Sequence, residues 1–224
     1  MTNEERDKAL YRYPDSTVLR NKLDIRDADA LRAVEARLVA DRIEEGAPTG
    51  RFDLDHLRGI HHHLFQDVYE WAGETRKVDI HKGGSAFHPA SRIEMGMADV
   101  HKRLAAQDFL KGLPPDRFAG EAAEFIGDVN RLHPFREGNG RTQLQYLKQL
   151  GAQAGHAVDL TRFERETWIR ASIEANKFQS ERMAECIRDS LASSPKRDDI
   201  ERLRELARAR REAGSKSRDR SEEP

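Results

Sequence analysis

Cysteine is almost absent from this chain of 224 residues, which has a single one at position 186. One thiol excludes an internal disulfide framework and is typical of a reducing compartment. Neither sign of charge is in excess, since 39 Lys and Arg stand against 40 Asp and Glu, so no overall basic field indicates nucleic-acid binding. The N-terminus has no apolar signal core, and no apolar run approaches the length of a membrane span. We therefore expect a protein that binds neither nucleic acid directly nor a membrane.

Apolar residues at intervals of three and four run along most of the chain, which is the pattern of amphipathic helices. Asp27 and Asp53 stand where helix N-caps are expected. The helix after Asp53 is expected to end near Gly73, and Gly155 is placed to end another helix. The buried stripe of the helix after Asp27 is expected to consist of Leu31, Val34 and Leu38.

Residues 76–88 are the one segment that breaks this pattern. Residues 78–80 alternate as a strand does, and Lys82-Gly83-Gly84-Ser85 can turn the chain back. The sequence therefore predicts an all-α fold, a compact bundle of about six to eight helices with one small β-hairpin.

The two ends of the chain differ from its middle. Residues 1–22 are polar and are expected to be irregular. Ser193-Ser194-Pro195 marks a boundary, after which charged residues dominate. We expect one domain over residues 1–194, with its core at about 53–191, and a charged tail over 195–224 that is partly helical or disordered.

Three consecutive histidines, His61 to His63, invite a metal-binding interpretation. Consecutive helical residues point in different directions, however, whereas zinc-binding pairs on a helix are four residues apart. His61 shares the apolar stripe of its helix with Leu57 and Leu64. The pattern therefore favours a partly buried histidine whose ring nitrogens are satisfied by hydrogen bonds.

The segment His133-Pro-Phe-Arg-Glu-Gly-Asn-Gly-Arg141 joins two expected helices and concentrates chemically useful side chains. Gly138-Asn139-Gly140 leads into the second helix, whose first amides lack intrahelical partners and favour negative charge. The two glycines allow a ligand to approach the backbone closely. Arg141, in the first turn, adds a planar positive group. This end of the helix is therefore a candidate phosphate-binding site.

Two further side chains of the same segment supply chemistry. His133 can accept a proton near neutral pH, and Glu137 offers the kind of oxygen that Mg²⁺ uses beside substrate phosphates. Phe135 is expected to plug the loop into the core. Together these groups suit the attack of a hydroxyl on a nucleotide phosphate. The alternative is a plain helix–loop–helix turn with a capping glutamate and a solvated arginine, which leaves the coincidence of residue types unexplained.

This segment resembles the signature HPFx(D/E)GNGRxxR of the Fic (filamentation induced by cAMP) proteins. The resemblance extends from about Tyr13 to about Leu191 and includes Trp71-Ala72-Gly73 and Val78-Asp79-Ile80. It implies the Fic fold and a protein adenylyltransferase, which transfers AMP from ATP to a hydroxyl side chain of a target protein. By this resemblance His133 is the base, Glu137 binds Mg²⁺, and the phosphates are held by Gly138, Asn139, Gly140 and Arg141.

The same resemblance gives the hairpin a function. In Fic proteins a hairpin flap covers the site and aligns the target segment by strand addition, a known mode of peptide recognition. Lys82, Gly83 and Phe87 would then contact the target or its nucleotide. The alternative for the hairpin is an ordinary surface loop with a turn lysine.

Leu144 departs from the signature, which has a second arginine at this position. In the family that arginine helps to hold the γ-phosphate, and an inhibitory glutamate engages it. Leucine can do neither, and its spacing from Leu147 suits a core contact. Loss of one charge-assisted phosphate contact would cost about 1.5–3 kcal/mol. A different donor (for UMP, phosphocholine or phosphate transfer) and an impaired nucleotide-binding module stay open as alternatives.

No (S/T)xxxE(G/N) inhibitory pattern occurs in the chain. The resemblance then implies the toxin of a toxin–antitoxin pair, restrained by a small separate antitoxin protein. Some related toxins modify type II DNA topoisomerases, which makes these enzymes the first targets to test. We expect a cytoplasmic bacterial protein, and delivery into a host cell as an effector stays open.

Overall fold

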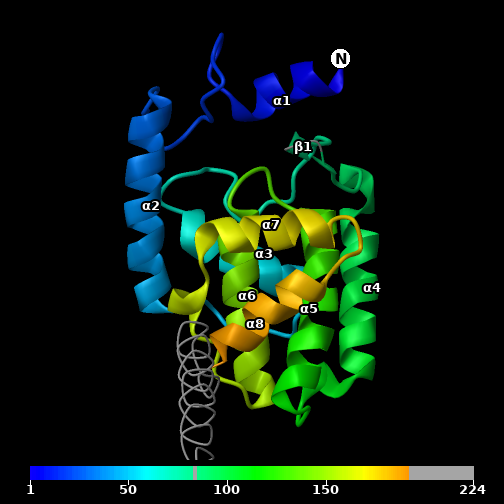
Figure 1. Cartoon of the computed structure of the whole chain (residues 1–224). Helices are drawn as coiled ribbons and strands as arrows, with labels where there is room; N and C mark the ends of the chain where they lie inside the picture. The colour runs from blue at the N-terminus through cyan, green and yellow to red at the C-terminus, as the bar shows by residue number, and fades with distance from the viewer. Residues whose placement is uncertain (83–84, 192–224) are drawn as a thin grey trace, which may run out of the picture.

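The computed structural model describes residues 1–82 and 85–191. Within these ranges the regular secondary structure is almost entirely helical (Figure 1), as predicted. The α-helices are α1 (Asn3–Tyr11), α2 (Ala28–Glu45), α3 (Leu54–Phe65), α4 (Ile93–Ala106), α5 (Pro115–Leu132), α6 (Asn139–Ala154), α7 (Arg165–Ala175) and α8 (Glu181–Ser190). Short 3-10 helices lie at Ala90–Arg92, Asp108–Leu110 and Leu160–Arg162, and the strands are β1 (His81–Lys82) and β2 (Ser85–Ala86).

Helix α5 lies at the centre of the bundle, because most of its residues are buried against other helices. It contacts α4, α6, α7 and α8, and Figure 1 shows α5 and α6 between α4 on one side and α2 on the other. The side chains that form its buried surface are Phe118, Ala122, Phe125, Ile126, Val129 and Leu132. Each large apolar side chain buried in this way contributes about 1.5–3 kcal/mol, so the bundle fixes the ends of α5 and α6 firmly.

The helix boundaries follow the predicted caps with one exception. The carboxylate of Asp27 accepts hydrogen bonds from the first amides of α2, and that of Asp53 accepts one from the first turn of α3. Gly155 ends α6 with φ of +94°. The prediction that α3 reaches Gly73 is wrong, since this helix ends at Phe65 and the following segment is buried without being helical.

The N-terminal segment is not irregular, as the sequence had suggested, because it contains α1. Thr2 and Glu5 form a capping box that starts this helix. Its apolar stripe is too weak to give a periodic signal. Tertiary contacts hold it instead, since Asp7 and Tyr11 are both buried. Figure 1 shows α1 lying across the end of the molecule that also carries the hairpin.

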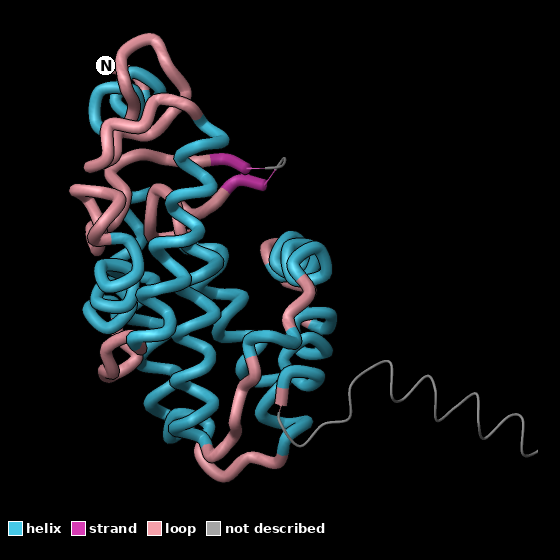
Figure 2. Tube along the Cα trace, turned by 90° about the vertical axis from the view of Figure 1, so that its left-hand side faces the viewer, coloured by secondary structure: helices cyan, strands magenta, loops and turns pink. Residues whose placement is uncertain are grey.

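The hairpin is present, but its first strand begins at His81, later than the sequence suggested. His81 pairs with Ala86 and Lys82 with Ser85 in an antiparallel register, and Figure 2 shows the hairpin projecting from the helical body. Residues 78–80 form no strand, because other groups occupy their backbone. The Val78 carbonyl accepts from Arg76, and both backbone groups of Asp79 bond to the Asn3 side chain.

We use "flap" for residues 78–82 and 85–88. Gly83, predicted to contact the target, and the predicted tail over 195–224 lie outside the described residues. Among the described helices, none combines the length and apolar character that crossing a membrane requires.

Candidate active site

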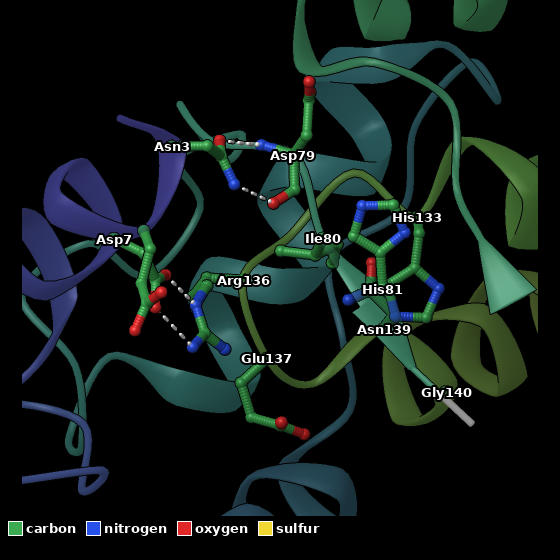
Figure 3. A pocket seen from close by; sticks show the side chains of 11 residues that line it. Asn3, Asp7, Asp79, Ile80, His81, His133, Arg136, Glu137, Asn139 and Gly140 are labelled. Carbon is green, nitrogen blue, oxygen red and sulfur yellow. Dashed lines mark hydrogen bonds and ion pairs between the residues drawn. The ribbon is translucent and has the colours of Figure 1, made fainter. Parts of the chain in front are cut away.

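A cavity of about 390 Å³ opens beside the loop between α5 and α6 (Figure 3). Besides Arg136 at the variable position, four residues of the predicted motif line it, namely His133, Glu137, Asn139 and Gly140. The remaining lining residues come from α1, the flap and the motif loop, and they are Asn3, Glu4, Asp7, Asp79, Ile80, His81 and Arg136. The cavity therefore joins the motif to two segments that are distant in sequence.

His133 occupies the C-cap position of α5 in a left-handed conformation, with φ of 46° and ψ of 63°. Its amide donates to the Val129 carbonyl at 3.0 Å, and its ring is half-buried at the cavity wall. The ring Nδ1 lies 3.4 Å from the Asn130 carbonyl oxygen. In the tautomer that donates from Nδ1, the basic lone pair of the ring is on Nε2.

Phe87 of the flap lies directly on this imidazole. The two ring centroids are 3.8 Å apart, and the ring planes are inclined by 22°. Stacking restricts rotation of the histidine ring and covers one of its faces. Phe87, one of the predicted flap residues, therefore contacts the candidate base His133. Lys82 lies in β1, where its backbone pairs with that of Ser85.

The glycines of the loop serve two different purposes. Gly138 is the N-cap of α6 with φ of +83°, and a Cβ at this position would lie 2.3 Å from Cζ of Phe65. A glycine N-cap has no side chain to cover the first amides of α6. At Gly140 a Cβ would meet nothing within 4 Å. The N-terminus of α6 thus presents unshielded backbone amides and a positive helix dipole at the cavity.

Asn139 and Phe135 give the loop its shape. The Asn139 side-chain oxygen accepts from the Phe135 amide at 2.9 Å, and its Nδ2 donates to the Phe135 carbonyl at 2.8 Å. Phe135 is 1% exposed and stacks on His61 with ring centroids 3.9 Å apart. The predicted plug role of Phe135 matches this position, and Asn139 organises the loop rather than pointing its amide at a ligand.

The three histidines of α3 point to three different carbonyl groups. His61 Nε2 lies 3.0 Å from the Glu137 carbonyl oxygen, while His62 and His63 bond to the carbonyls of Ala72 and Arg42. His61 Nδ1 also accepts from an amide, that of Gly73, so both nitrogens of this buried ring are satisfied. This arrangement confirms the predicted satisfied histidine.

Glu137 stands at the cavity with a side chain that is 38% exposed. One carboxylate oxygen accepts from the Gly138 amide at 3.0 Å, which keeps the carboxylate next to the start of α6. Mg²⁺ at nucleotide sites needs only one or two protein carboxylates, because phosphate and water oxygens complete its shell. A single accessible carboxylate beside an anion-binding helix end therefore fits such an ion.

Arg141 does not line the cavity, because a buried carboxylate of α2 holds it. Its Nη2 lies 2.5 Å from Oε1 of Glu35, and its guanidinium lies over the Phe65 ring at 4.7 Å. The Tyr69 hydroxyl donates to the other oxygen of Glu35. Burial and the Glu35 charge raise the pKa of Tyr69, so this hydroxyl stays protonated.

Glu35 was not identified as a site residue from the sequence. The sequence pattern predicted that Val34 and Leu38 face the core, whereas the buried residues lie one position further along, at Glu35 and Val39. The buried residues are Leu31, Glu35 and Val39, whereas Val34 is 37% exposed. The sequence did contain a signal, because Glu35 lies four positions from Leu31 and four from Val39. An acid on an apolar stripe needs a buried partner, and here that partner is Arg141.

A second carboxylate holds the variable residue of the motif. Arg136 makes two hydrogen bonds to Asp7 of α1, from Nε at 2.5 Å and Nη2 at 3.1 Å, as Figure 3 shows. Burial pushes the pKa of Asp7 up, but Arg136 and Arg12 outweigh this effect and hold it below its ordinary value. No local pattern could have paired residues so far apart in sequence.

Leu144 is half-buried and packs against the hydrophobic core. This position agrees with the core-contact interpretation of the residue that departs from the motif.

The loop and its surroundings match a known family. A model described as the Fic/DOC family matches residues 51–150. The chain is also 40% identical over 164 residues to the probable protein adenylyltransferase y4lH of Sinorhizobium fredii, an alignment that covers 73% of this chain and 85% of y4lH. The chain therefore belongs to the Fic/DOC family.

Among individual relatives, the protein adenylyltransferase VbhT of Bartonella schoenbuchensis is 42% identical over 184 residues. This alignment covers 81% of the chain but only 38% of VbhT, so the chain spans well under half of that protein.

Solved structures of effector proteins share the fold. The BepC protein of Bartonella tribocorum with bound AMPPNP has a TM-score of 0.74 at 28% identity, covering 83% of this chain and 97% of that one. An N-terminal Fic domain from Bartonella quintana with bound ADP has a TM-score of 0.74 at 31% identity, covering 84% of this chain and 96% of that one. Both proteins are described as VirB-translocated effectors.

Proposed function

We propose that this chain is a protein adenylyltransferase, which transfers AMP from ATP to a Tyr, Thr or Ser hydroxyl of a target protein. The observation that carries the proposal is that one cavity brings the His133 imidazole together with the unshielded N-terminus of α6. The names of VbhT and y4lH support the reaction type. The nucleotides bound to the two Bartonella structures support a nucleotide donor.

In the proposed reaction Nε2 of His133 accepts the proton of the target hydroxyl as its oxygen attacks the α-phosphorus of ATP. A bond forms between the target oxygen and the α-phosphorus, and the bond to the oxygen that bridges the α- and β-phosphates breaks. Pyrophosphate leaves with the electron pair of the broken bond. The amides at the start of α6 stabilise the charge that develops on the phosphate oxygens.

Glu137 is the residue that would hold Mg²⁺, which when bound supplies positive charge to the phosphates. The contact between Glu137 and the Gly138 amide keeps this carboxylate beside the phosphate-binding end of α6. Asn139 and Phe135 maintain the loop conformation, and Phe87 and the flap close the side of the cavity next to His133.

Leu144 bears on the choice of donor. Because a leucine cannot bind a γ-phosphate, ATP would be held mainly by its α- and β-phosphates in this proposal. The transfer of UMP, phosphocholine or phosphate is the alternative within the same fold, and a nucleotide-binding module with impaired transfer is the other. The adduct mass on a modified target distinguishes these alternatives.

The proposed biological setting is that of a toxin and its antitoxin. VbhT is 42% identical to this chain, and by the family resemblance we propose a toxin that a small separate antitoxin protein restrains. A type II DNA topoisomerase is the first target to test. We propose that the protein acts in the bacterial cytoplasm, with the VirB-translocated effectors as the alternative model for delivery into a host cell.

Labelled ATP tests the proposed function directly. The full chain is incubated with bacterial lysate and ATP carrying the label at either the α- or the γ-phosphate. We expect protein labelling from the α-label only, and loss of about 10²–10⁴-fold in His133→Ala. His156→Ala is the matched control, because that ring bonds to the Leu113 carbonyl and follows the C-terminal end of α6, whereas the cavity lies at the N-terminal end of that helix. Labelling from the γ-phosphate, or unchanged labelling in His133→Ala, would refute the proposal.

A further inference from the structure

Arg76 has its guanidinium in the interior of the protein, where arginine is rarely found. The residue is 2% exposed and lies between α3 and the flap. Its nitrogens donate to four backbone carbonyls, those of His133 from Nε at 2.9 Å, Val78 from Nη1 at 2.6 Å, Leu132 from Nη2 at 3.1 Å and His88 from Nη2. No carboxylate lies closer to it than that of Asp79, at 3.7 Å, among the described residues.

Two of these carbonyls belong to the end of α5. The last carbonyls of a helix have no intrahelical donor and need another partner. The carbonyls of Leu132 and His133 receive theirs from Arg76, and the Arg76 amide donates to the Pro134 carbonyl at 2.8 Å. A non-glycine residue in the left-handed region persists only where its surroundings hold it. Arg76 therefore fixes the backbone conformation that aims the His133 ring.

The other two carbonyls lie at the two ends of the flap. Val78 precedes β1 and His88 follows β2, and Arg76 bonds to both. The His88 amide donates in turn to the Arg131 carbonyl of α5 at 2.9 Å. One guanidinium thus connects both stems of the flap to the residue that is the candidate base.

We propose that Arg76 is a positioning residue, which sets the flap and the His133 imidazole at a fixed distance from each other. The inference rests on the proposed function, in which His133 accepts the proton of the target hydroxyl. A planar guanidinium with five donors can reach four carbonyls in two segments. The ammonium of a lysine keeps the charge but gathers its donors at one atom, so it cannot maintain this arrangement.

Arg76→Lys in the full chain tests the role, with Arg162→Lys as the matched control. Arg162 also donates to backbone carbonyls, those of Asp189 and Leu191, but at the end of α8. The measurements are the transfer of α-labelled AMP into lysate protein per folded molecule, and the Kd for AMPPNP with Mg²⁺. We expect Arg76→Lys to lose about 10²-fold in transfer, a loss that a misplacement of about 1 Å can cause, while its Kd for AMPPNP stays near the wild-type value.

Chemical rescue provides a readout that a merely structural role would not change. Guanidinium ion at non-denaturing concentration should restore part of the transfer activity of Arg76→Ala, whereas equal urea should not. If Arg76→Lys fails to fold, Arg76→Gln, which keeps two donors, is measured in the same way. Transfer per folded molecule equal to that of the wild type, or no rescue by guanidinium, overturns the proposal.

A spectroscopic arm separates this inference from the proposed function. In ¹⁵N-histidine-labelled protein, the His133 ring signals are assigned by their loss in His133→Gln. If the wild type transfers no AMP, the proposed function fails, but shifted His133 signals in Arg76→Lys and unshifted ones in Arg162→Lys still support the positioning role. His133 signals that stay in place in Arg76→Lys overturn it.

Discussion

His61 and Glu137 are joined by a hydrogen bond of 3.0 Å between the Nε2 of the imidazole and the carbonyl oxygen. The His61 Nδ1 accepts from the Gly73 amide at 2.8 Å, so the ring must be neutral with its proton on Nε2. Its stacking on Phe135 adds a second contact to the motif. His61 of α3 thus holds the backbone of Glu137, the candidate metal ligand.

This contact predicts how stability depends on pH. Burial lowers the pKa of His61 from its ordinary value of 6.5 to about 3. As the pH falls through 6.5, His61 therefore binds a proton in the unfolded chain but not in the folded chain. The free energy of unfolding decreases as the pH falls from 6.5 toward 3. Between pH 6.5 and pH 5 this loss is about 2 kcal/mol, at 1.36 kcal/mol for each pH unit.

Urea unfolding of the wild type and His61→Gln between pH 7.5 and pH 5 checks the prediction. The variant should be less stable at neutral pH, because glutamine cannot reproduce the hydrogen bonds of the His61 ring or its stacking on Phe135. Its stability should nevertheless fall less on acidification than that of the wild type. Parallel pH curves for the two proteins would show that His61 is not the responsible group.

The glycines of the loop should separate folding from nucleotide binding. In Gly138→Ala the new methyl would collide with Phe65 at a positive φ, and we expect a loss of about 1–3 kcal/mol in stability. Gly140→Ala meets nothing within 4 Å and should fold at least as well, since alanine favours a helix by about 0.5–1 kcal/mol over glycine.

The methyl of Gly140→Ala would nevertheless stand where phosphate is expected to approach the backbone. Calorimetric titration with Mg²⁺·ATP should therefore show affinity about tenfold or more weaker, which corresponds to 1.4 kcal/mol. Thermal melts of both variants give the stability comparison. Wild-type affinity in Gly140→Ala would place the phosphates elsewhere.

Glu35→Gln tests whether the buried acid competes with phosphate for Arg141. Removing the charge leaves the Arg141 guanidinium with only the more distant carboxylate of Glu137, at 3.8 Å, which should lower stability by about 1–3 kcal/mol. The released guanidinium should then tighten the binding of Mg²⁺·ATP by about tenfold. Tyr69→Phe is the control, because it removes a hydrogen bond to Glu35 without changing any charge. Equal ATP affinities in the two variants would speak against competition.

Phe87 should affect the rate of transfer more than the stability of the fold. Its side chain is only half-buried, but its ring covers His133. Because an aromatic pair is worth about 0.5–1.5 kcal/mol, Phe87→Ala should lower the rate constant of transfer up to about tenfold, and Phe87→Tyr should restore it. Steady-state kinetics with varied target concentration separate this role from target docking, which would raise the KM for the target instead.

The helices, most of their caps and the motif loop could be predicted from sequence because their signals are local. Asp27 and Asp53 act within three residues of their own position, and the stripe of α5 repeats every three or four residues. The family and fold predicted from the motif are confirmed. The catalytic, metal-binding and phosphate-binding roles of the motif residues remain predictions.

The contacts that hold the motif could not be predicted, because each joins distant parts of the chain. Asp7 and Arg136 are 129 residues apart, and Glu35 and Arg141 are 106 apart. No periodic pattern reports such pairs. The position of the first strand was predicted wrongly for a related reason. Side chains of Asn3 and Arg76 bond to the backbone groups of residues 78 and 79, which a strand at that position would have used.

The attachment of α1 to the motif loop through Asp7 has a practical consequence for anyone who expresses this protein in pieces. A fragment cut to the family-matched segment 51–150 would contain the whole motif segment 133–141. It would, however, leave two arginines of that segment, Arg136 and Arg141, without the acids Asp7 and Glu35 that anchor them. Such a minimal fragment would be a poor substitute for the 224-residue chain in any assay of nucleotide binding or transfer.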